Sequence, residues 1–111
     1  MEQLIKNVPH AQPFFIQDQV QYETGRVVSL TIAQQPGAGM TLFAFDAGTS
    51  ISTHAASGDA MAVILEGTGE ITIDGVPHTV NAGECIIMPA GIPHAVRAVT
   101  RFKMHLILVK P

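Results

Sequence analysis

The sequence predicts an all-β domain, built either as an antiparallel barrel or as a sandwich of two sheets. Short apolar runs recur at regular spacing through the 111 residues, with Gly, Pro or Asn between them. None shows the period of a helix, and this pattern is typical of antiparallel all-β folds. Asp74-Gly75 lies between two alternating runs, and a two-residue hairpin turn needs positive φ at both of its central positions. The stretch from Met61 to His94 therefore organises the predicted fold as a double hairpin.

The elements follow in order from the punctuation of the chain. Residues 1–12 are polar and broken by proline, which predicts an N-terminal arm or an edge strand, and residues 13–111 form the predicted single domain. Phe14-Phe15-Ile16 begins either a short strand or a turn. Residues 34–39 contain Pro36-Gly37 and predict a loop. The predicted strands are 27–33, 40–46, 51–55, 61–66, 70–74, 76–80, 85–88, 94–98 and 102–109.

Composition excludes several classes of function. The chain is 47% hydrophobic and 14% charged, which excludes a disordered protein. A net charge of −3 provides no basic surface for nucleic acid or for an anionic membrane. The first ten residues lack a secretory signal, and no apolar run approaches the ~20 residues that span a bilayer, so we expect a cytoplasmic protein. The single cysteine, Cys85, lies in an apolar run and is expected to pack in the core as a small hydrophobic residue.

Several predicted strands are apolar on both faces. Ala62 and Ile64 face one way, whereas Met61, Val63 and Leu65 face the other. A closed barrel has a single interior, so the second apolar face needs another cover. Because the chain has so little helix to supply that cover, we predict a homodimer.

The second half of the chain carries a motif of glycine, proline and histidine at fixed spacing. It runs Gly83, five residues, Pro89, one residue, Gly91, two residues and His94. This motif resembles the second motif of the cupins and matches the family spacing without a gap. The resemblance implies a small antiparallel double-sheet (jelly-roll) cupin barrel. The turn residues of this motif support the fold more than any particular chemistry.

The first cupin motif is matched less fully, by Gly48, five residues, His54 and then Gly67. The family's second histidine falls on Ala56, and its glutamate falls on Ala60. Of the four metal ligands that the family uses, the resemblance therefore carries over two, His54 and His94.

Two imidazoles alone hold a divalent ion loosely, since catalytic metal sites generally use three protein ligands. Asp59 and His105 are the candidates for an additional ligand. Strand alternation directs Asp59 away from the face of Ala60, but a bulge at Gly58 would redirect it. The implied cofactor is a divalent transition metal (Zn, Ni, Fe or Mn). The alternative is a metal-free barrel mouth in which the two histidines bond to water or to backbone.

Alanine at positions 56 and 60 removes polar groups and volume from the barrel centre, so we expect a roomier and more apolar cavity. The predicted pocket consists of His54, His94, Ala56, Ala60, Phe43, Ile64 and Met88. A concave apolar pocket with a few polar groups is the usual site for a small-molecule ligand. We rank a small-molecule binding module first. The alternative is a metal-dependent cupin enzyme of the isomerase or dioxygenase type that acts on a small organic molecule.

Overall fold

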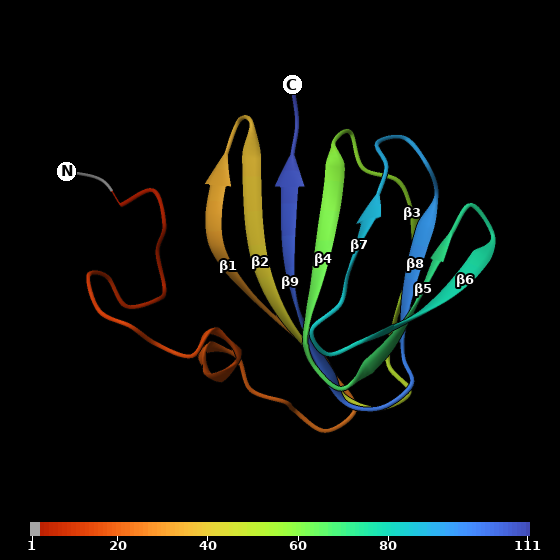
Figure 1. Ribbon diagram of the computed structural model, residues 1–111, viewed down its shortest axis with the longest axis horizontal. Helices are drawn as coiled ribbons and strands as arrows, with labels where there is room; N and C mark the ends of the chain where they lie inside the picture. Colours follow the sequence, from red (N-terminus) through yellow and green to blue (C-terminus); the bar gives the residue numbers. More distant parts are fainter. Residues whose placement is uncertain (1–2) are drawn as a thin grey trace.

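Within residues 3–111, which the computed structural model describes, nine strands form two antiparallel sheets (Figure 1). Sheet A has five strands in the order β1-β2-β9-β4-β7, and sheet B has four in the order β3-β8-β5-β6. The strand bounds are β1 Val27–Gln35, β2 Ala38–Phe45, β3 Ser50–His54, β4 Asp59–Glu66, β5 Thr68–Ile73, β6 Val76–Asn81, β7 Cys85–Met88, β8 His94–Ala98 and β9 Phe102–Val109. The predicted all-β double-sheet fold is confirmed.

The Asp74-Gly75 hairpin is formed as predicted. Ile73 pairs with Val76, and the two turn residues have φ of 50° and 79°. Positive φ at both positions gives the backbone twist that matches the flanking strands. The last three strands also have the bounds that the sequence predicts, because Gly or Pro punctuates the chain before β7 and β8.

The predicted loop over residues 34–39 is wrong in extent. Strand β1 continues to Gln35 and β2 starts at Ala38, so that only Pro36 and Gly37 connect them. A two-residue connection lets the ladder between the strands run to the turn, and Gln35 pairs with Ala38 there. The segment beginning at Phe14 is not a strand, since Ile16–Gln19 forms a short 3₁₀ helix, η1.

The N-terminal arm was predicted over residues 1–12, of which residues 1 and 2 lie outside the described residues. Residues 3–12 contain no strand and run beside β1. The Lys6 N–H donates to the Ile32 carbonyl at 2.8 Å, and the Asn7 side-chain amide donates to the Thr31 carbonyl at 2.8 Å. Both acceptors lie at the irregularity between Thr31 and Ala33, where the β1 ladder shifts register.

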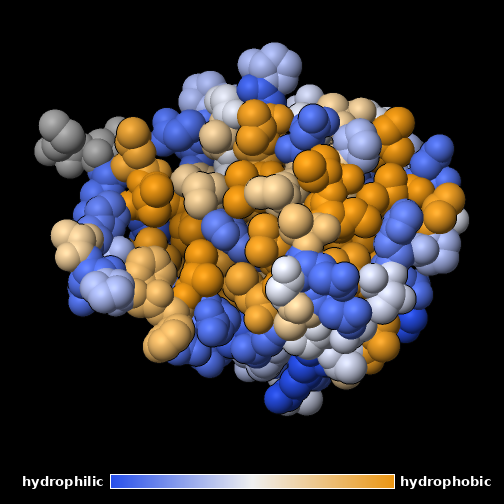
Figure 2. All heavy atoms as spheres, viewed as in Figure 1, coloured by the Kyte–Doolittle hydropathy of each residue, from blue (hydrophilic) through white to orange (hydrophobic). Residues whose placement is uncertain are grey.

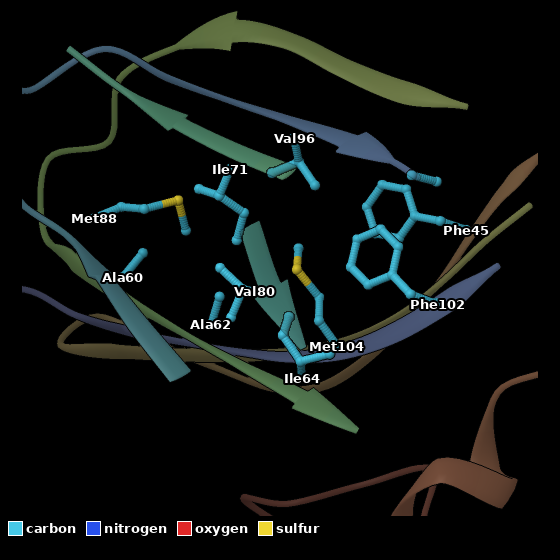
Figure 3. Close-up of a cluster of buried hydrophobic side chains, with 11 residues drawn as sticks. Phe45, Ala60, Ala62, Ile64, Ile71, Val80, Met88, Val96, Phe102 and Met104 are labelled. Atoms are coloured by element: carbon cyan, nitrogen blue, oxygen red, sulfur yellow. The ribbon is translucent and has the colours of Figure 1, made fainter. Parts of the chain in front are cut away.

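The core lies between the two sheets (Figure 3). Phe45 and Phe102 are fully buried and stack with ring centroids 4.4 Å apart. The aliphatic side chains and methionines that complete this cluster are Ala60, Ala62, Ile64, Ile71, Val80, Met88, Val96, Ala98 and Met104. Burial of this apolar surface is the main force that holds the sheets together.

The outer face of sheet A is also apolar, as the sequence predicts. The N-terminal segment covers part of it, over a second cluster that includes Val20 and Leu42. Lys103 is 5% exposed, and its ammonium group donates to the Gln17 carbonyl at 2.7 Å, which fastens η1 to this face. Figure 2 shows hydrophobic side chains spread across the middle of the face seen in Figure 1.

The predicted burial of Cys85 is wrong. Its side chain is exposed on β7, where it pairs with Val63 on the outer face of sheet A. The inward positions of this strand are Ile86 and Met88, because side chains alternate between the two faces.

Within the described part of the chain, no helix has the length and apolar character needed to cross a membrane.

Candidate functional site

His54 and His94 face each other across two neighbouring strands. They are register partners on β3 and β8, and their ring centroids lie 4.5 Å apart with the planes inclined by 71°. Side chains at directly opposite positions of an antiparallel pair lie on the same face of the sheet. His94 alternates with Val96 and Ala98, which are both buried in the core, so this is the inner face of sheet B.

A one-residue irregularity in β3 brings His54 to this position. Ile51 pairs with Val96, and the next partners are His54 and His94, so β3 has one residue more than β8 between the two pairs. In a regular ladder Thr53 would stand opposite His94. The extra residue is a β-bulge, which redirects the side chains beyond it, and here it places a second imidazole beside the first.

Backbone carbonyls fix the orientation of both rings. The Nδ1 atom of His54 lies 3.0 Å from the Ser52 carbonyl oxygen, and the Nδ1 atom of His94 lies 3.2 Å from the Ile92 carbonyl oxygen. A carbonyl oxygen only accepts hydrogen bonds, so each Nδ1 is the donor. When an imidazole with this hydrogen bond is neutral, the lone pair of its Nε2 atom is free to accept a hydrogen bond from a ligand.

The environment keeps His94 neutral. Burial lowers its pKa from the usual value, and the neighbouring His54 lowers the pKa further, whereas the contact with the Ile92 carbonyl opposes both effects. The His94 side chain is 4% exposed, which explains why loss of hydration is the leading cause. At neutral pH the site therefore presents an uncharged acceptor at the inner position.

Asp59 does not join the two histidines. Its carboxylate is on the face opposite to Ala60, as alternation predicts, and Oδ1 accepts the Ala90 N–H at 2.9 Å. The proposed bulge at Gly58 is absent from the ladder, because Asp59 pairs with Val109 and Ala60 with the residue before it. The glycine is needed for another reason, since a Cβ at this position would overlap the Val109 carbonyl.

His105 lies on the outer face of β9, between Leu42 on β2 and Val63 on β4. Its Nε2 atom is buried without a hydrogen-bond partner, and burial lowers its pKa. Among residues 3–111 no group of three or more His, Cys, Asp or Glu side chains is placed to hold a metal ion. The donors that the fold brings together are the two imidazoles, which is fewer than the three protein ligands of a usual catalytic metal site. The residues do not fit a resident metal.

The other predicted pocket residues lie in and around the core. Ala60, Ile64 and Met88 are each at most 2% exposed, and Phe43 is partly buried and packs against the core cluster to which they belong. Met88 is the register partner of Ala60, and its side chain extends into the barrel centre beside that alanine (Figure 3). Ala56 is partly buried, and its carbonyl accepts the Gly91 N–H at 2.8 Å. The Met88 side chain therefore fills part of the space that Ala60 leaves at the barrel centre.

One feature of the inner face of sheet A escaped the sequence reasoning. A cavity of about 270 Å³ lies where Thr31 of β1 pairs with Thr41 of β2, beyond the inward ring of Phe43. The signal in the sequence was the pair of threonines at inward positions of otherwise apolar strands, but their facing depends on register.

Comparisons with known proteins identify the fold family. A model described as "Cupin domain" matches residues 41–110. No curated protein matches the chain. Among solved structures, a conserved protein of unknown function from Streptococcus pyogenes is 43% identical, with 99% of this chain and 96% of that chain covered and a TM-score of 0.96.

Two further solved structures extend the comparison. A cupin superfamily protein from Desulfitobacterium hafniense is 29% identical over 96% of this chain and 98% of that chain, with a TM-score of 0.92. A salicylate 1,2-dioxygenase from Pseudoaminobacter salicylatoxidans is 17% identical over 84% of this chain and 29% of that chain, with a TM-score of 0.71. At that identity the dioxygenase shares the fold, and its activity does not transfer to this chain.

Proposed function

This chain belongs to the cupin superfamily, and from the position of its two imidazoles in that barrel we propose that it binds a small molecule through the Nε2 atoms of His54 and His94. The observation that carries the proposal is the pairing itself. Two rings 40 positions apart in the chain are register partners, and each has its Nδ1 atom against a backbone carbonyl. In the proposed complex the two Nε2 atoms bind one ligand.

The chemistry of the histidine pair limits the class of ligand that can bind. A neutral His94 accepts a hydrogen bond through Nε2, so the ligand supplies a hydroxyl or an N–H group at that point. The inner-face neighbours of His94 are apolar: Val96 lies two positions along β8, and Ile73 is the register partner of His94 on β5. A small organic molecule with one polar end and an apolar body matches this arrangement.

The proposal does not include a resident metal. Two imidazoles alone would hold a divalent ion loosely, and neither Asp59 nor His105 lies on their face. The alternative, a metal-dependent enzyme of the isomerase or dioxygenase type, requires a third ligand. That ligand would have to come from water, from the substrate or from a rearrangement of the chain.

The test is a thermal-shift screen of small metabolites on untagged protein freed of metal with a chelator, followed by calorimetry on each hit. A ligand at tenfold excess over its Kd stabilises the fold by about 1.4 kcal/mol. We expect this stabilisation to be lost in His54→Gln and His94→Gln and retained in the control His78→Gln, whose imidazole is exposed on β6.

Two results would count against the proposal. Equal binding by both mouth variants and wild type would place the ligand elsewhere. Recovery of one transition-metal ion per chain after reloading, with loss of the metal in His94→Gln, would favour the enzyme alternative.

We further propose that two chains associate through the outer face of β4, β7 and β9. Ile87 and Val109 are 56% and 61% exposed there, and Met61, Val63 and Ile107 are half-buried. Residues 60–65, 85–88 and 104–109 contain no Asp, Glu, Lys or Arg. A two-fold axis places this patch against itself. Asp59, the register partner of Val109, lies at the edge of the patch, and its carboxylate accepts the Ala90 N–H there.

A further inference from the structure

A cavity separate from the histidine pair opens on the inner face of sheet A. Its volume is about 270 Å³, and its lining comes from the end of β1, the start of β2 and the end of β9. Figure 1 shows these strand ends side by side. Neither His54 nor His94 lines it. The volume is close to the lower limit of ordinary ligand pockets, roughly 300 Å³, so the cavity suits a small molecule.

The cavity exists because the inward side chains of β2 are smaller near the start of that strand than deeper in the barrel. Deeper in the barrel the inward positions of β2 are Phe43 and Phe45, whose rings lie 5.8 Å apart. Nearer the mouth the same face of β2 carries Thr41 and Gly39, and Thr41 pairs with Thr31 of β1. Removal of aromatic volume from one end of a close-packed interior leaves a hollow there.

Three kinds of group converge on this hollow. Leu106 and Leu108 on β9 form an apolar wall that continues into the core. The hydroxyl-bearing Thr31 and Thr41 lie beside it. Lys110 stands two positions beyond Leu108, so alternation carries its side chain to the same face, where it lines the cavity.

Lys110 is held in position and its charge is available. Its backbone N–H donates to the Gly37 carbonyl at 3.0 Å, which fixes the end of β9 against the β1–β2 turn. Among the described residues, no carboxylate lies within ion-pair distance of its ammonium group, whereas Lys103, Arg97 and Arg101 each have an acidic partner.

We propose that this cavity binds a small organic monocarboxylate, with the carboxylate on Lys110 and the threonine hydroxyls and the apolar body against Leu106 and Leu108. One ammonium group matches one negative charge, and hydrogen bonds to ionised groups are stronger than those between neutral groups. A phosphate dianion would meet a single cation and no helix N-terminus. The site goes beyond the proposed function and does not depend on the histidine pair.

Calorimetry with benzoate and hexanoate, and with benzamide as the neutral match for benzoate, tests the proposal. We expect both carboxylates to bind wild type and benzamide to bind more weakly, with carboxylate affinity falling as salt is added. Lys110→Met keeps the length of the side chain and removes its charge, and it should weaken benzoate binding by about tenfold or more. The control Lys6→Met removes a charge from the arm and should leave the affinity unchanged.

Gly39→Leu tests the cavity independently of charge. A Cβ at Gly39 would contact the Leu108 Cβ at 3.8 Å, an ordinary packing distance, and the glycine does not have positive φ. The leucine side chain then occupies the hollow and should abolish binding of both carboxylates. If this variant fails to fold, Lys110→Met and Thr41→Val still test the site.

The two histidine variants separate this site from the barrel-mouth pair. Benzoate binding that persists in His54→Gln and His94→Gln and is lost in Gly39→Leu supports the cavity site, whatever the fate of the histidine proposal. Benzoate binding that is lost in the two histidine variants but is unchanged in Lys110→Met overturns the proposal of a carboxylate site in the cavity. Failure of wild type to bind either carboxylate, or equal binding of benzoate and benzamide, also overturns it.

Discussion

His54 and His94 are register partners on β3 and β8, and their ring centroids lie 4.5 Å apart. The two rings differ in exposure: His54 is exposed, and His94 is buried. An imidazole pair at this separation interacts electrostatically when either ring becomes charged. The pKa of His94 therefore reports on the neighbouring imidazole, whether or not a ligand is bound.

Replacement of His54 by glutamine should raise the pKa of His94 toward its usual value of about 6.5. The electrostatic effect of the neighbouring His54 is one cause of the lowered pKa of His94, and the substitution removes that imidazole. The pKa should stay below the usual value, because burial is the larger cause and is unchanged. Titration of the His94 ring proton by NMR, in chelator-treated protein, measures the shift.

The matched control is His78→Gln, which removes an exposed imidazole from the hairpin without touching the pair. It should leave the His94 titration where it is. An unchanged His94 pKa in His54→Gln would mean that the rings do not sense each other in solution, and the shared ligand site would lose its basis.

His105→Leu should stabilise the protein. The Nε2 atom of His105 is buried without a partner, and a buried polar group that makes no hydrogen bond costs about 1–3 kcal/mol. Leucine keeps the apolar contacts beside Leu42 and Val63 and removes that cost. Urea unfolding at neutral pH should show a higher midpoint with an unchanged m-value, and a lower midpoint would contradict this account.

The same variant should also reduce the acid sensitivity of the fold. Burial lowers the pKa of His105 in the folded state, so between that lowered value and about 6.5 the unfolded chain binds more protons than the folded one. Stability therefore rises with pH through this window and falls on acidification. Loss of the imidazole should flatten the dependence, and urea unfolding of wild type and His105→Leu at several pH values measures the difference.

The sequence was sufficient to predict the features that depend on local chemistry. Asp74-Gly75 specified a hairpin because few residues tolerate positive φ, and Gly91 has positive φ in the turn before β8. Pro89 ends β7 because proline has no backbone N–H for the ladder. The meeting of His54 and His94 followed from a resemblance between spaced motifs. None of these inferences needed contacts between distant parts of the chain.

Features set by register and by distant contacts were not predictable. The bulge in β3 that brings His54 opposite His94 has no clear signal in the Ser52-Thr53 pair. Asp59 finds its partner, the Ala90 N–H, 31 positions away. The segment around η1 is fastened through Lys103, 86 positions beyond Gln17. In each case contacts between residues far apart in the chain decide where the side chain lies. The alternation of side chains along a single strand carries no information about such contacts.

Gly67→Ala should be strongly destabilising, at more than about 2 kcal/mol. Gly67 has φ of 76°, and a Cβ there would overlap the Arg101 carbonyl and the backbone of Phe102. The control is Gly83→Ala, which has a similar φ of 88° but nothing within 4 Å of the added Cβ. It should cost about 1 kcal/mol from the left-handed backbone alone. If urea unfolding shows equal losses of unfolding free energy in the two variants, the backbone around Gly67 adjusts to the added Cβ without further cost.

Association through the outer face of sheet A is tested by Ile87→Lys. Ile87 is 56% exposed on β7, so a lysine there costs little in the monomer but would place an unpaired charge inside an interface between two copies. Sedimentation equilibrium should show wild type as a dimer that dissociates on dilution, and Ile87→Lys as a monomer at the same concentrations. Val76→Lys is the matched control, because Val76 is also 56% exposed but lies at the hairpin end of β6. A wild type that stays monomeric at every concentration, or an Ile87→Lys variant that dimerises as wild type does, would show that this face is not where two copies meet.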